Sequence, residues 1–94
     1  MNNLKRARMT STPDFDRFLY EAIASDREAG AGLGPDSLYG LYTSWCMMSR
    51  SPIASPEALF RALKEHGISP WSNRLAMTGP AATDYILASA PSLV

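Results

Sequence analysis

Three times along the chain a proline is followed at once by an acidic residue, at Pro13-Asp14, Pro35-Asp36 and Pro56-Glu57. Proline suits the first position of a helix because its φ angle is already helical and its missing N–H has no helical partner there. An acidic residue in the first turn faces the positive end of the helix dipole. Each pair therefore indicates a helix start, and we expect three helices that begin near these positions.

The ends of these helices follow from the point at which the apolar spacing of three and four residues stops. The first helix is expected over 13–26, with Thr12 as its cap, because a glycine-rich stretch then makes helical continuation costly. The second is expected over 35–50. The third is expected over 56–66 and closes at Gly67, since glycine readily adopts the left-handed conformation that ends helices.

The helical period disappears after Gly67. Apolar residues at Ile68, Trp71, Leu75 and Met77 are separated by serine, proline and asparagine, which favour turns. This pattern predicts two short strands joined by a turn. The segment 81–89 fits either a short helix or an extended piece.

Three helices followed by a two-stranded ribbon predict a mainly α protein, a three-helix winged helix-turn-helix with a short β-ribbon wing and a C-terminal tail or short helix. In this interpretation residues 50–55 form the turn of the motif. Residues 1–12 would be a flexible basic arm, 13–79 the domain and 80–94 a C-terminal extension. A plain helical bundle with a floppy tail is the alternative.

The chain has 94 residues, 46% of them hydrophobic and 19% charged, which is typical of one globular domain. It contains no apolar stretch of the roughly 18 residues that a membrane crossing needs. Its one cysteine, Cys46, and one histidine, His66, cannot supply the ligands of a zinc site or form a disulfide. We expect a cytoplasmic protein without metal or cofactor.

Residues suited to catalysis are few, so we expect no enzyme. Nothing in the sequence orients His66, and a histidine in the last turn of a helix commonly stabilises the negative end of the helix dipole. Cys46 lies beside the apolar stripe of its helix, where a thiol serves as a small hydrophobic group. Met47 and Met48 are expected to fill the core rather than to form a binding surface.

Positive charge gathers in particular segments although the whole chain is neutral. The net charge is +3 over residues 1–13, −4 over 14–36 and +2 over 37–78. The basic segments coincide with the arm, the third helix and the wing, which are the elements that such a fold lays on a DNA duplex. The acidic first helix would face away from the DNA.

This distribution predicts a DNA contact made by the basic and polar side chains of these three elements. The candidate residues are Lys5, Arg6, Arg8, Ser55, Arg61, Lys64, Ser72, Asn73 and Arg74. So few phosphate contacts predict weak binding to double-stranded DNA by a monomer at physiological salt.

Two other interpretations stay open. Glu57 and Arg61 are four residues apart, so they can pair with each other on an ordinary solvated helix face. The protein can also be an interaction adaptor that binds a protein partner, or a second copy of itself, through Trp71, Met77 or the C-terminal tail.

A set of spaced aromatic residues carries a family resemblance. The pair Leu38-Tyr39 is followed at intervals of three by Tyr42 and Trp45, and then by Ser55-x4-Phe60-x2-Leu63-x3-Gly67-Ile68. Over residues 15–68 this sequence resembles the C-terminal winged-helix domain of phage- and plasmid-encoded primase–helicases. The resemblance implies a helix-turn-helix DNA-binding role in the replication of a mobile element. For a free-standing copy we expect a phage or mobile-element protein that acts in replication or transcriptional regulation. The helicase and primase regions of that family are absent, and its basic final strand is replaced by residues 73–79.

Overall fold

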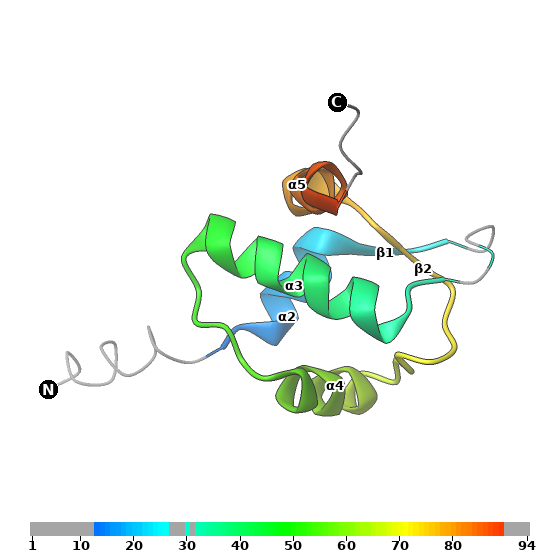
Figure 1. Ribbon diagram of the computed structural model, residues 1–94. Helices are drawn as coiled ribbons and strands as arrows, with labels where there is room; N and C mark the ends of the chain where they lie inside the picture. Colours follow the sequence, from blue (N-terminus) through cyan, green and yellow to red (C-terminus); the bar gives the residue numbers. More distant parts are fainter. Residues whose placement is uncertain (1–12, 27–29, 31, 90–94) are drawn as a thin grey trace, which may run out of the picture.

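The computed structural model of the protein describes residues 13–26, 30 and 32–89. The chain is mainly helical, as expected, with a small antiparallel sheet (Figure 1). Its elements are, in order, α2 (Phe15–Ala22), β1 (Ile23–Ser25), α3 (Pro35–Ser49), α4 (Pro56–Glu65), β2 (Leu75–Met77) and α5 (Gly79–Ser89). Helix α3 lies between α4 and α5, so these two helices cover opposite sides of the molecule (Figure 1).

Two of the three proline-marked helix starts are confirmed. Helix α3 begins at Pro35, and α4 begins at Pro56 behind Ser55, whose hydroxyl accepts the Ala58 N–H at 3.2 Å. Helix α2 starts later than expected because the Asp14 carboxylate caps it, accepting the Arg17 N–H at 3.0 Å. The expected cap, Thr12, lies outside the described residues.

The expected end of the first helix at residue 26 is wrong. Helix α2 stops at Ala22, and the chain continues as β1, which pairs antiparallel with β2 so that Ile23 lies opposite Met77. The backbone N–H and carbonyl groups of residues 23–25 pair with β2, far along the chain, and are therefore not used to extend the helix. The two-stranded ribbon expected after Gly67 is also wrong, because within 68–77 only β2 is a strand and its partner is β1.

The C-terminal segment is a helix, which decides between the two alternatives that the sequence leaves open. Helix α5 packs on α3 so closely that a Cβ at Gly40 would collide with the ring of Tyr85. Its residues Ala81 and Ala82 are buried in the same core as the other helices. The segment that the sequence analysis places in an extension, 80–94, therefore contributes a helix to the folded unit.

An aromatic cluster forms the centre of the core. The ring of Phe18 meets those of Tyr42 and Trp45 edge-on, with centroids 5.2 and 5.7 Å apart. From α4, Leu59 and Leu63 are fully buried against it, which leaves the other side of α4 to solvent. Within the described ranges, no helix combines the length and apolar character needed to cross a bilayer.

The end of α3 departs from the sequence-based expectation. Cys46 is buried, as predicted, but Met47 and Met48 are exposed, so the expectation that both fill the core is wrong. The inward stripe of α3 finishes at Trp45 and Cys46, and the helix ends at Ser49. Apolar character alone does not tell which side of a helix end a neighbouring element will cover.

Candidate functional site

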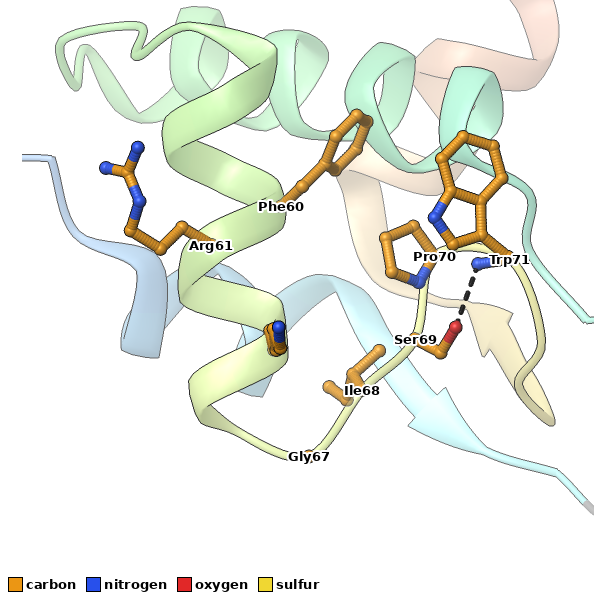
Figure 2. A pocket seen from close by; sticks show the side chains of 8 residues that line it. Phe60, Arg61, Gly67, Ile68, Ser69, Pro70 and Trp71 are labelled. Atoms are coloured by element: carbon orange, nitrogen blue, oxygen red, sulfur yellow. Dashed lines mark hydrogen bonds between the residues drawn. The ribbon is translucent and has the colours of Figure 1, made fainter.

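A groove of about 610 Å³ lies between α4 and the segment that follows it. The reversal at Gly67, whose φ is +76°, creates this groove by turning the chain back beside the helix. The Ile68 N–H donates to the Leu63 carbonyl at 2.8 Å, which completes a glycine-based helix end. The lining residues are Phe60, Arg61, Lys64, Gly67, Ile68, Ser69, Pro70 and Trp71 (Figure 2).

One wall of the groove is a turn that is fixed by side-chain hydrogen bonds. The Ser69 hydroxyl accepts the N–H groups of Trp71 at 3.1 Å and Ser72 at 3.2 Å. The amide of Asn73 donates to the Ser69 carbonyl at 2.7 Å. Pro70 is buried, whereas the Trp71 side chain projects from the turn and stays 77% exposed. The turn therefore presents a large aromatic ring to solvent in a defined position.

The charge of the groove differs from that of the helix beside it. Helix α4 carries two acidic residues, Glu57 and Glu65, and two basic ones, Arg61 and Lys64. Only the two basic residues line the groove. In the part of the chain that the structure describes, neither of them forms an ion pair, so the Glu57–Arg61 pair allowed by the sequence is not formed. Both charges are available to an anion.

Arg61 and the apolar residues of the groove lie on different sides of α4. Figure 2 shows Phe60, Pro70 and Trp71 on one side of the helix, while Arg61 extends from the other. A ligand that contacts both must therefore cross the helix, as an extended chain can.

The remaining candidate residues lie elsewhere. Ser72, Asn73 and Arg74 line a neighbouring groove of about 480 Å³, which includes the acidic Asp26. The 67–69 segment borders both grooves and so separates these residues from Arg61. The Ser55 hydroxyl is used to cap α4. The basic residues Lys5, Arg6 and Arg8 lie outside the described residues.

Two of these residues, Asn73 and Arg74, make hydrogen bonds within the fold. The Asn73 amide accepts the Leu33 N–H and donates to the Leu33 carbonyl, both at 2.9 Å, so it ties the loop before α3 to the turn after α4. Arg74 belongs to the sheet edge, where its carbonyl accepts the Asp26 N–H at 2.9 Å. The structure thus brings Arg61 and Lys64 together and leaves the other expected contacts in separate places.

An acidic residue of the first helix lies close to the end of α4. The expectation that this helix faces away from DNA stays a prediction. Asp16 of α2 lies 2.8 Å from the Nε2 atom of His66, which caps the C-terminal end of α4. One carboxylate therefore sits near the end of the groove, beside but not within its lining.

The apolar wall of this groove was only partly foreseen. From the sequence, Phe60 is expected on the inner apolar stripe of its helix and Trp71 in a short strand. Phe60 is half-buried, so it serves both the core and the groove. The signal for Trp71 was its position between Pro70 and Ser72, since a bulky aromatic within a turn has no strand partner to cover it.

The described residues contain no group of three or more histidine, cysteine or acidic side chains that could hold a metal ion. Burial raises the pKa of the Cys46 thiol and raises that of Tyr42 to about 12, so both groups are neutral parts of the core. Of the proposed docking residues, Met77 packs against this core while Trp71 is free of it.

No protein-family model, curated protein or solved structure matches the chain. The resemblance to the winged-helix domain of primase–helicases therefore stays a prediction.

Proposed function

We propose that the protein is a small non-enzymatic DNA-binding protein of winged-helix type, in which α4 and the segment after it contact the DNA. One observation carries this proposal: Arg61 and Lys64 are exposed, without ion-pair partners among the described residues, and line a groove that contains no carboxylate. The resemblance noted above suggests a role in replication or transcriptional control for a cytoplasmic phage or mobile-element protein.

The order of elements supports the winged-helix part of the proposal. A helix, a strand, two helices joined by the short 50–55 connection, and a second strand paired with the first follow one another along the chain. In this scheme α4 is the second helix of a helix-turn-helix motif. Helix α5 then occupies the place in the sequence where a wing strand would follow.

A salt series on a short duplex of random sequence tests this function. With three to five phosphates neutralised, the logarithm of the association constant should fall with the logarithm of the salt concentration at a slope of roughly −3 to −4. Replacing both Arg61 and Lys64 by alanine should make that slope shallower by about 2 and weaken binding at low salt at least tenfold. Fluorescence anisotropy of a labelled duplex measures both.

A matched control removes the other charges of the same helix. Glu57→Gln combined with Glu65→Gln should strengthen binding, because two carboxylates that repel phosphate are gone. Absence of binding at about 50 mM salt, or a salt slope that the double alanine variant leaves unchanged, would reject the proposal.

An adaptor role is the second candidate, and exposed apolar side chains on α5 favour it. Ile86 and Leu87 are exposed on a helix whose only charged residue is Asp84. Such a surface is suited to a protein partner or a second copy of the chain. Sedimentation velocity of the wild type and of Leu87→Glu tests self-association, which the substitution should abolish if α5 is the contact.

A further inference from the structure

We propose that the groove beside α4 binds an unpaired nucleotide of a DNA strand, with the base stacked on Trp71 and the adjoining phosphates on Arg61 and Lys64. This inference rests on the proposed DNA-binding function and adds the structural class of DNA that the groove selects. It gives a role to the most exposed tryptophan of the described chain, which duplex recognition by α4 does not require.

The presentation of Trp71 is the first argument. Two backbone N–H groups bonded to the Ser69 hydroxyl and the buried Pro70 fix the turn, so the ring is held outward rather than folded onto the core. Among the described residues, the indole N–H has no hydrogen-bond partner and the ring makes no aromatic contact. A flat, uncovered and positioned ring is what a base needs for stacking.

The form of DNA follows from this geometry. In a duplex, both faces of each internal base are covered by its neighbours, and only base edges reach the grooves. A base can present its face to Trp71 only when it is unpaired, in a single strand, an overhang or a bulge. The other walls, Phe60, Ile68 and Pro70, are apolar and suit the ring of such a base.

The charges are placed for the backbone of the same strand. Arg61 and Lys64 are three residues apart on one helix, so their Cβ atoms are about 5–6 Å apart. Arg61 extends from the side of α4 opposite to Trp71 (Figure 2). A strand whose base stacks on Trp71 can therefore continue across α4 and pass both cations. Charge complementarity favours this polyanion, since the groove lining holds two positive charges and no negative one.

The experiment compares one labelled duplex with the same duplex carrying a single-stranded thymidine overhang of about six nucleotides. The overhang should bind about tenfold more tightly, because stacking of one base on an aromatic ring contributes on that order. Trp71→Ala should remove this preference, so that the two DNAs bind with about equal affinity. Tyr20→Ala, which removes another exposed aromatic ring, on α2, should keep the preference.

A direct optical signal comes from Trp71 itself. Its emission should be quenched by oligothymidine in the wild-type chain, and the Trp71→Ala chain, which retains only the buried Trp45, should show no quenching. Circular dichroism of each variant confirms that the fold is retained.

The outcomes separate the inference from the function on which it rests. Equal affinity for the two DNAs, or a preference that survives Trp71→Ala, overturns the inference while duplex binding stands. Binding of neither DNA overturns both. Quenching of Trp71 by an acidic leucine-rich peptide, with none by oligothymidine, also overturns the inference and makes the groove a protein-binding site. Binding of the overhang DNA alone supports the inference and rejects duplex recognition.

Discussion

The two tryptophans of this protein occupy opposite environments. Trp45 is 4% exposed, its ring contacts Phe18, and its indole N–H donates to the Glu21 carboxylate at 2.9 Å. Arg17 lies over the same ring at 5.6 Å and bonds the other oxygen of Glu21. These two hydrogen bonds lower the pKa of Glu21 below its ordinary value of 4.5. Trp71 projects from a turn and has none of these contacts among the described residues.

This difference separates residues that stabilise the fold from residues that are free for a partner. A buried aromatic ring contributes to stability through apolar area and ring contacts, and its polar atom needs a partner. An exposed ring contributes little to the folded state. The aromatic cluster around Trp45 is therefore the stabilising region, and the groove around Trp71 is the region available for binding.

The largest effect is expected when a ring of the aromatic cluster is removed. Phe18→Ala should lower the free energy of unfolding by about 3–5 kcal/mol, because it removes a fully buried ring and leaves a cavity. Trp71→Ala should change it by less than about 0.5 kcal/mol. Chemical denaturation measures both. A loss of more than about 1.5 kcal/mol in the free energy of unfolding for Trp71→Ala would contradict this difference between the two tryptophans, because Trp71 would then be a structural residue.

The next largest effect is a loss of stability at high pH, which arises when Tyr42 of the aromatic cluster loses its proton. Burial raises the pKa of Tyr42 from 10.0 to about 12, so the folded chain holds this proton more tightly than the unfolded chain. The contribution of the protonated Tyr42 hydroxyl to the free energy of unfolding is fully present below pH 10.0, and it is lost as the pH rises to about 12. Its size is on the order of 2 kcal/mol, and the raised pKa of Cys46 acts in the same direction.

Denaturation curves over this alkaline range test the assignment to Tyr42. Tyr42→Phe should be less stable at neutral pH, because the Ala54 N–H loses the hydroxyl that accepts it at 3.0 Å. The variant should also show a shallower alkaline decline. An unchanged decline would assign the pH dependence to other groups.

A smaller effect is expected where α5 joins the core. Gly40→Ala places a methyl group against the Tyr85 ring and should cost about 1–2 kcal/mol of stability. In a Tyr85→Ala background the same change should stabilise the chain by up to about 1 kcal/mol, since alanine is the better helix former. Urea denaturation of the wild type, the two single variants and the double variant measures the coupling between Gly40 and Tyr85. Equal effects of Gly40→Ala in both backgrounds would show that the two helices are not in close contact.

The smallest effect is expected in the groove. Ser69→Ala removes the acceptor of two exposed N–H groups, which water can replace, so the stability loss should be about 0.5 kcal/mol. Ser69→Thr keeps the hydroxyl and should match the wild type. A loss above about 2 kcal/mol would mean that the turn is part of the stabilising region.

The elements that could be predicted are those set by local chemistry. Pro35 and Pro56 marked the true starts of α3 and α4, and Gly67 marked the end of the third helix, because caps and turn conformations depend on a few adjacent residues. The strand at 23–25 was missed for the opposite reason. Its sequence continues a helical pattern, and only pairing with residues 75–77 makes it a strand.

The candidate site divides in the same way. Arg61 and Lys64 were expected on the exposed face of their helix, since three-residue spacing puts them close together. The separation of Arg74 from them, and the structural use of the Asn73 amide, depend on how the turn packs against a distant loop. No local pattern records such contacts.

The amino-acid sequence alone determined where α3 and α4 begin and which of their residues form the apolar stripes, because these depend on short-range backbone and side-chain preferences. Tertiary structure alone decided that residues 23–25 leave the first helix, that α5 joins the core, and that the ring of Trp71 remains uncovered. Those outcomes depend on contacts between segments far apart in the chain, whose free energy appears only when the whole chain is packed.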